Sequence, residues 1–274
     1  MGRPSSSTQR QVTRYISDTC QHDDDRLAVE EPLEIRIGTE PLAITMRTPG
    51  HDIDLAAGFC LTEGIVEDGS ELESVEPCML TDYGNIVVVT LTEETTVRRR
   101  KQIEGSRREM YLSSSCGLCG KQSIDRVEKA IRPIRGQFTI SRRILASMPD
   151  RMSDSQATFA QTGGLHAAAL FDPADCKLKV IREDVGRHNA VDKVIGHQTL
   201  LGRLPIDPRI LMVSGRSSFE IMQKAAVAGI AMVAAVSAPS SLAVDFAIQT
   251  GMTLVGFLRP GRMNVYHDVN RIVD

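Results

Sequence analysis

The feature that most constrains this fold is the alternation of apolar strands and helices that follows Gly164. Short apolar runs, such as 209–214 and 231–237, are separated by segments in which apolar residues recur at helical spacing. This order is typical of a largely parallel sheet covered by helices, whose strands are apolar on both faces. We therefore expect an α/β domain over 151–274. Its predicted elements are a strand pair at 165–171 and 177–183 around the turn DPADC, helices at 188–197, 219–229 and 242–251, and strands at 209–214, 231–237 and 252–258.

The preceding half of the chain has the pattern of a smaller α+β portion, over 27–150. LEIRIG and LAITMRT alternate apolar and polar residues around TEP, as an antiparallel pair does, and YGNIVVVTLT predicts a further strand. A helix is expected from Asp52 to near Gly64, and another between Cys119 and Pro133. Short helices are expected from Ser141 and from Ser153, where Ser-x-x-Gln forms a capping box. Residues 1–26, rich in Ser, Thr, Arg and Asp, predict a flexible arm.

Composition narrows the class of protein. The 42% hydrophobic content suffices for an ordinary core, and the longest apolar run, 225–236, is shorter than the roughly 20 residues that a membrane-spanning helix needs. The first twenty residues hold no secretion signal, so a cytoplasmic protein without membrane contact is expected. Aromatic residues make up only 4%, and no nucleic acid partner is expected. Between Arg98 and Arg143, thirteen basic residues face four acidic ones, which fits either an anionic partner or a solvated helical face.

A pair of cysteines in SSSCGLCG, residues 113–120, is the strongest local signal. Six cysteines are too few for a disulfide scaffold in 274 residues, and Cys60 has the setting of a buried structural thiol. Glycines beside Cys116 and Cys119 predict a mobile loop. As a zinc half-site the pair lacks two ligands, and His166 and His188 would have to come from the fold. As a redox dithiol it lacks a thioredoxin-like preceding strand, whereas a nucleophile near a helix start and Lys121 would have a stabilised thiolate.

Four loops are predicted at the carboxyl end of the sheet, where ligands of open α/β sheets bind. They are EDVGRHN, SGRSS, SAPSS and FLRPGR. Arginine side chains and unpaired helix N-terminal amides match phosphate. Any one loop alone is better explained as an ordinary cap or turn, whereas four such loops at one sheet edge favour a phosphorylated ligand. No Walker loop and no G-x-G-x-x-G is present. The candidate binding residues are Asp184, Arg187, His188, Ser214, Gly215, Arg216, Ser217, Ser237, Ser240, Phe257, Leu258, Arg259, Pro260, Gly261 and Arg262, together with His166 at a strand start.

With these blocks assembled, residues 30–270 resemble the formate dehydrogenase accessory sulfurtransferase family, FdhD. The resemblance rests on SSCGLCG, TGGLHAAAL, REDVGRHNAVDKVIG, SGRSSFEIMQKAA, SAPSSLAVDFA and GFLRPGRMNVY, in that order. It implies a cytidine-deaminase-like three-layer α/β/α fold, although the deaminase H-x-E signature is absent at His166. It also implies a cytoplasmic homodimer that carries sulfur to formate dehydrogenase.

The resemblance further implies a donor, a cargo and residue roles. A cysteine desulfurase would supply sulfur as a persulfide on Cys116, with Cys119 assisting. The sulfur would pass to bis-molybdopterin guanine dinucleotide, the molybdenum cofactor, whose nucleotide GDP would mimic, and residues 257–262 would match the family's cofactor-binding stretch. Two other functions remain open: a zinc-dependent deaminase-like hydrolase, and a cofactor-binding chaperone that transfers no sulfur.

Overall fold

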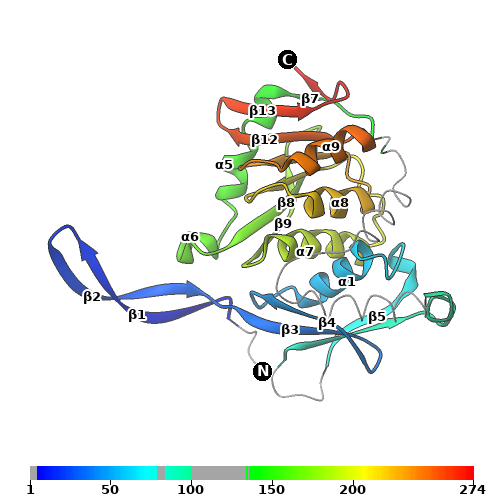
Figure 1. The fold of residues 1–274 in the computed structure, drawn as a ribbon, viewed down its shortest axis with the longest axis horizontal. Helices are drawn as coiled ribbons and strands as arrows, with labels where there is room; N and C mark the ends of the chain where they lie inside the picture. Colours follow the sequence, from blue (N-terminus) through cyan, green and yellow to red (C-terminus); the bar gives the residue numbers. More distant parts are fainter. Residues whose placement is uncertain (1–4, 79–83, 100–133, 135) are drawn as a thin grey trace.

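A six-stranded mixed sheet forms the larger part of the molecule (Figure 1). The computed structural model describes residues 5–78, 84–99, 134 and 136–274. In the sheet, β10, β11 and β12 are parallel neighbours, whereas β8 and β13 are antiparallel to theirs. The strand order is β13 (Arg262–His267), β12 (Thr253–Arg259), β11 (Met232–Ala235), β10 (Ile210–Val213), β8 (His166–Phe171) and β9 (Leu178–Asp184).

The expectation of a largely parallel sheet was therefore only partly correct. Two hairpins, β8–β9 and β12–β13, introduce antiparallel strands because their short turns leave no room for a crossover helix. The first hairpin was predicted from the sequence. The second was not, since Pro260 and Gly261 were assigned to a loop that leads to no further strand. The secure description is a mixed α/β fold, and likeness to cytidine deaminases stays a prediction.

Helices cover both faces of this sheet. Its central strands are apolar on both faces, so both faces must be buried. Side chains alternate along β10: Leu211 and Val213 join one core cluster, and Ile210 and Met212 join the other. Three long helices bury the first face, and two short ones the second, which gives a helix, sheet and helix layering. They are α7 (Arg187–Leu200), α8 (Phe219–Val227) and α9 (Ser241–Thr250) on the first face, and α4 (Arg142–Leu145) and α5 (Met148–Ser153) on the second.

The N-terminal portion contributes a second sheet and one helix to the same core. The predicted antiparallel pair and the helix from Asp52 are confirmed, and the predicted 83–92 strand appears as β6. Helices α1 and α7 touch backbone to backbone: a Cβ added to Gly58 would lie 1.9 Å from the Asp192 carbonyl oxygen, and one on Gly196 would lie 1.8 Å from that of Asp54. The sheet order is β4 (Glu40–Arg47), β3 (Glu31–Ile37), β6 (Ile86–Leu91) and β5 (Leu72–Pro77), packed on α1 (Asp52–Thr62).

Two details of the middle region differ from expectation. Ser153 ends α5, so its predicted capping box does not form, whereas Ser141 caps α4 by accepting the Ile144 amide as predicted. Strand β7 (Ile140–Ser141) pairs with β14 (Ile272–Val273), and Leu145 and Met148 pack on the large sheet. Residues 136–153 therefore belong with the C-terminal sheet, and the boundary expected after residue 150 does not match the packing.

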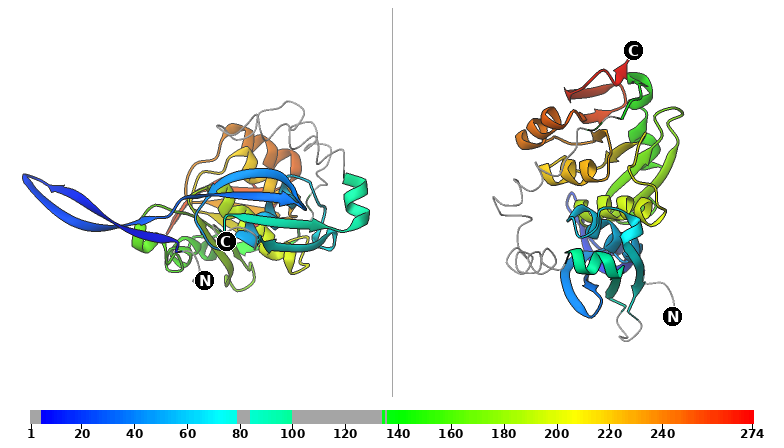
Figure 2. Two further views of the ribbon diagram at one scale, coloured as in Figure 1. Left: turned by 90° about the horizontal axis from the view of Figure 1, so that it is seen from below. Right: turned by 90° about the vertical axis from the view of Figure 1, so that its right-hand side faces the viewer.

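The N-terminal segment that we expected to lack regular structure is a β-ribbon. Strands β1 (Ser7–Ile16) and β2 (Thr19–Ala28) pair along their whole length and extend away from the body (Figures 1 and 2). Ser17 takes a positive φ of 52° in the tight turn, and Arg14 forms an ion pair with Asp23. The sequence did not predict these strands because polar residues occupy both faces, which removes the apolar alternation of a half-buried strand.

The two remaining expectations about the chain concern the cysteine loop and membranes. The SSSCGLCG segment, 113–120, and the helix expected after it lie outside the described residues. None of the helices in the part of the chain that the structure describes combines the length and hydrophobicity needed to cross a lipid bilayer.

Candidate functional site at the carboxyl edge of the sheet

One edge of the large sheet gathers the binding residues that the sequence predicted outside the cysteine pair. Strands β9, β10, β11 and β12 all end there, and β8 begins there, so that His166 is paired with Asp184. The loops after β10 and β11 are joined through their backbones: the Ser217 amide donates to Ala238 and the Ser240 amide donates to Ser217, at 3.2 and 3.0 Å. The β12 end joins this rim, because the Phe257 amide donates to the Ser237 carbonyl at 3.1 Å.

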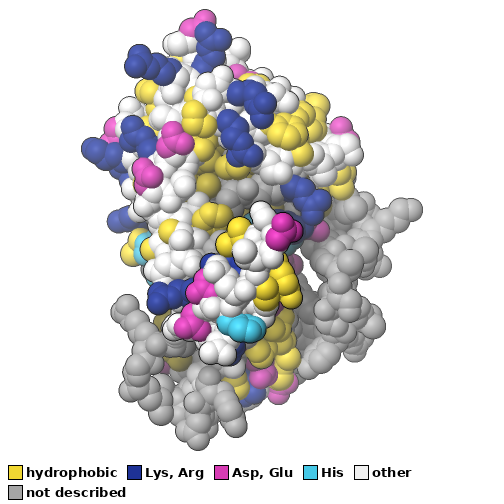
Figure 3. Space-filling model, turned by 90° about the vertical axis from the view of Figure 1, so that its left-hand side faces the viewer, with side chains coloured by type: hydrophobic (Ala, Val, Ile, Leu, Met, Phe, Trp, Pro, Cys, Tyr) yellow, Lys and Arg dark blue, Asp and Glu magenta, His cyan; other side chains and the backbone are white. Residues whose placement is uncertain are grey.

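The rim carries positive charge. Arg216, Arg259 and Arg262 are exposed, and Figure 3, which views this edge, shows Lys and Arg side chains outnumbering acidic ones over the upper half. The Nε of Arg187 and the Oγ of Ser217 are buried and have no hydrogen-bond partner among the described residues. Unpaired buried donors of this kind are costly in a folded protein unless a ligand or water satisfies them.

His166 lies at the start of β8, beside Gly215 and Arg187. A Cβ added to Gly215 would be 3.3 Å from the His166 Nδ1 and 3.6 Å from the Arg187 Cβ, so glycine keeps this corner open. Burial, and then the nearby charges of Arg187 and His188, lower the pKa of His166. The imidazole is therefore neutral at pH 7, with one ring nitrogen available as an acceptor and the other as a donor.

A second histidine, His188, is held by an acidic residue that the sequence analysis missed. Its Nε2 lies 3.2 Å from the Glu220 Oε2 and 3.3 Å from the Ser218 Oγ, and Ser218 also donates to Glu220 at 2.7 Å. The hydrogen bond from His188 is the main cause that lowers the pKa of Glu220 to about 2. A carboxylate in the first turn of a predicted helix, two residues after SGRSS, was the available signal.

Three of the predicted residues support the rim from within rather than face a ligand. Asp184 is fully buried: Lys193 lies 2.6 Å from its Oδ2, and the Gly186 amide donates to its Oδ1. Leu258 is part of the apolar core, and the Ser240 hydroxyl caps α9 by accepting the Ala243 amide. Their place at this edge was predicted correctly, and their side chains hold its loops in shape.

The histidines do not form a metal centre within the described residues, where no group of three His, Cys, Asp or Glu side chains gathers. The cysteine pair lies outside them. Cys60 is confirmed as a buried thiol, and burial raises its pKa to about 12, so it stays protonated and unreactive.

Comparison with known proteins agrees with this geometry. The FdhD/NarQ family matches residues 28–273. A protein called sulfur carrier protein FdhD from Streptomyces avermitilis is 48% identical, over 99% of this chain and 97% of its own. The chain belongs to the FdhD/NarQ family.

Other FdhD relatives extend the likeness in sequence and in fold. The sulfur carrier protein FdhD of Mycobacterium tuberculosis is 44% identical over 97% of this chain and 99% of its own. The crystal structure of a putative formate dehydrogenase accessory protein from Desulfotalea psychrophila has the same fold, with a TM-score of 0.78, 23% identity, and coverage of 98% of this chain and 100% of that one. The relatives from Streptomyces avermitilis and Mycobacterium tuberculosis are both named as sulfur carrier proteins.

Proposed function

We propose that this FdhD protein is a sulfurtransferase that takes sulfur from a cysteine desulfurase and delivers it to bis-molybdopterin guanine dinucleotide before formate dehydrogenase receives that cofactor. It acts in the cytoplasm as a homodimer. The observation that supports this cofactor as the cargo is the chemistry of the carboxyl edge. Exposed arginines there lie near two buried polar atoms, Arg187 Nε and Ser217 Oγ, that have no hydrogen-bond partner among the described residues.

The chemistry of the edge suits the nucleotide half of that cargo. Arg216, Arg259 and Arg262 offer planar, permanently charged groups that match phosphate oxygens, and α7 and α8 begin at the same edge. Phe257, 36% exposed next to these arginines, offers an aromatic surface against which a guanine base can stack. GDP is therefore the simplest probe of the site.

The sulfur step belongs to Cys116. Its thiolate attacks the outer sulfur of the desulfurase persulfide, a new S–S bond forms on Cys116, and the desulfurase cysteine leaves as a thiolate. If the Cys119 thiolate then attacks Cys116, the outer sulfur departs as hydrosulfide and a Cys116–Cys119 disulfide remains. The same disulfide formed before loading would instead block the carrier, so Cys119 either assists or competes.

The experiment that tests the function is mass spectrometry of the protein after incubation with a cysteine desulfurase and cysteine. We expect a gain of one sulfur on the Cys116 peptide that reductant removes. Cys116→Ser is expected to fold normally and carry nothing, and Cys119→Ala is the matched control for loss of a neighbouring thiol. Active formate dehydrogenase matured with the Cys116→Ser protein would overturn the carrier role of Cys116 and leave a cofactor-binding chaperone. Metal bound in place of sulfur would favour the zinc hydrolase.

A further inference from the structure

The β1–β2 ribbon extends far from the rest of its own chain. Each strand has ten residues, which at about 3.3 Å per residue makes the ribbon about 33 Å long. Among the described residues, its side-chain hydrogen bonds to the body lie at its base: Arg26 donates to Gln161 at 2.7 Å, and the Ser6 hydroxyl lies 3.4 Å from that of Thr158. None of the ribbon's residues is buried. An isolated two-stranded hairpin is marginally stable in water, so a ribbon of this length requires another surface.

The tip of the ribbon has the character of a protein-binding surface. Tyr15 is 75% exposed and Ile16 is 54% exposed, next to the turn at Ser17 and Asp18. The whole ribbon, residues 7–28, carries three arginines and four aspartates, so its net charge of −1 (3 − 4) gives no attraction to nucleic acid or to an anionic membrane. Large apolar side chains on a nearly neutral arm favour contact with a protein.

The same chain contains a matching apolar surface. Ile44 and Met46 lie two residues apart on β4, the outermost strand of the smaller sheet, and are 70% and 47% exposed. Their cross-strand neighbours are Glu34 and Pro32, on the face opposite the buried Leu33 and Ile35. Because β2 leads almost directly into β3, the partner of β4, the arm and this patch belong to neighbouring parts of the molecule.

We propose that the β1–β2 ribbon is an exchanged arm whose tip, Tyr15 and Ile16, packs on Ile44 and Met46 of a second copy of this chain. A two-fold axis lets each copy give its arm and receive the other, so the contact is made twice. This inference rests on the proposed homodimer and names the surface that forms it. It is independent of the sulfur chemistry.

The test is the mass of the purified protein in solution across a dilution series, by light scattering after size exclusion. The unmodified protein is expected at about 60 kDa, twice the 30.0 kDa of one chain. Tyr15→Ser/Ile16→Ser and Ile44→Ser/Met46→Ser are each expected to weaken dimerisation at least about tenfold, since each removes apolar area from both contacts. Val97→Ser changes a side chain that is 74% exposed elsewhere and is the control.

Mixing the two double variants tests the pairing of arm and patch directly. In a mixed dimer one contact has an intact tip on an intact patch, so the mixture is expected to form dimers at concentrations at which each variant alone is monomeric. A monomeric unmodified protein would overturn both the homodimer and the arm. A dimer that both double variants leave intact would overturn the arm alone, as would mixing that restores nothing. Unchanged far-ultraviolet circular dichroism confirms that the variants, all at exposed positions, remain folded.

Discussion

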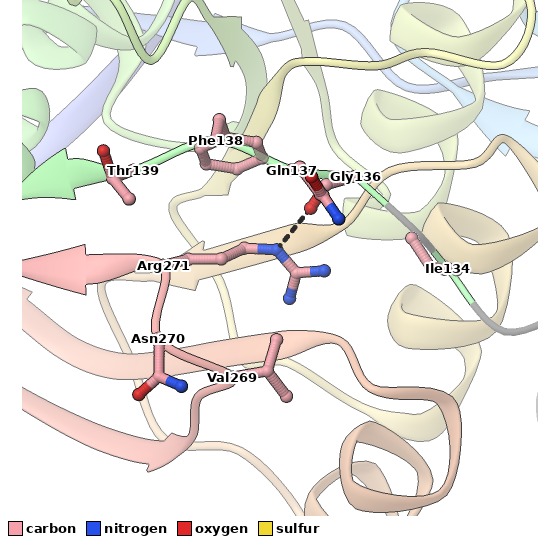
Figure 4. Close-up of a pocket in the computed structure, with 8 residues that line it drawn as sticks. All are labelled: Ile134, Gly136, Gln137, Phe138, Thr139, Val269, Asn270 and Arg271. Carbon is pink, nitrogen blue, oxygen red and sulfur yellow. Dashed lines mark hydrogen bonds between the residues drawn. The ribbon is translucent and has the colours of Figure 1, made fainter.

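The two edges of the large sheet use arginine in opposite ways. At the amino edge, where β12 begins, Arg271 is 4% exposed and donates to the Gly136 carbonyl at 2.9 Å (Figure 4). It also donates to the Gly251 carbonyl at 2.9 Å and to the Thr253 hydroxyl at 3.1 Å. At the carboxyl edge the arginines of the rim are exposed or, like Arg187, keep a buried nitrogen without a partner among the described residues. The arginine at the amino edge uses its donors to hold neighbouring segments of the chain together, whereas the arginines at the carboxyl edge keep donors available for a ligand.

The hollow at the amino edge makes the contrast sharper. A space of about 610 Å³ lies there, lined by residue 134, residues 136–139 and residues 269–271. Its arginine is committed to backbone oxygens, and its other side chains include Phe138, Thr139, Val269 and Asn270. Volume alone would suggest a ligand in this hollow, whereas the availability of charged donors supports the proposed anion site at the opposite edge.

The largest effect is expected from removing the buried arginine at the amino edge. Arg271→Ala would leave the Gly136 and Gly251 carbonyls without their buried donor and is expected to lower the free energy of unfolding by about 2–4 kcal/mol. Urea unfolding measures this. The control is Arg203→Ala, since Arg203 is exposed. A loss no greater than that of the control would show that the amino-edge arginine does not act as a structural support.

The second largest effect is expected from removing an exposed arginine at the carboxyl edge. Arg262→Ala is expected to weaken GDP binding about tenfold, or about 1.4 kcal/mol, because it removes one phosphate donor. The free energy of unfolding should stay within about 0.5 kcal/mol of the unmodified protein, since the side chain is exposed. Calorimetric titration with GDP gives the affinity, again against Arg203→Ala. Equal affinities for the two variants would remove Arg262 from the site.

A smaller effect, in the stability of the rim, depends on pH. Glu220 has a pKa of about 2 in the folded protein against 4.5 as its ordinary value, so its contribution is fully present above about pH 4.5 and is lost as the pH falls toward 2. Glu220→Gln is expected to lower the free energy of unfolding by about 1–2 kcal/mol at pH 6 and by progressively less between pH 4.5 and pH 2. A difference that stays constant over this range, measured by urea unfolding, would contradict the ion pair with His188.

The sequence predicted the position of the carboxyl edge because strand order alone decides which loops meet there. It did not predict β13 because no strand was assigned after the loop FLRPGR, and it did not predict the ribbon because polar residues occupy both of its faces. Nor did the sequence show that Asp184 would be buried and support the rim, whereas Arg216 would be exposed on it. That distinction depends on which side chain meets Lys193 across the fold, and spacing along the chain carries no such information.

The contact between Gly58 and Gly196 also limits how the protein can respond to its cargo. Helices packed backbone to backbone have no side chains between them that could slide or tilt, and the core on either side of them is continuous. The close approach of α1 and α7 and the shared core therefore tie the smaller sheet to the larger one. Within the described residues, this leaves the rim loops to adapt to a ligand. A larger residue at either Gly58 or Gly196 would push α1 away from α7, and so separate the smaller sheet from the larger one, before it altered ligand binding.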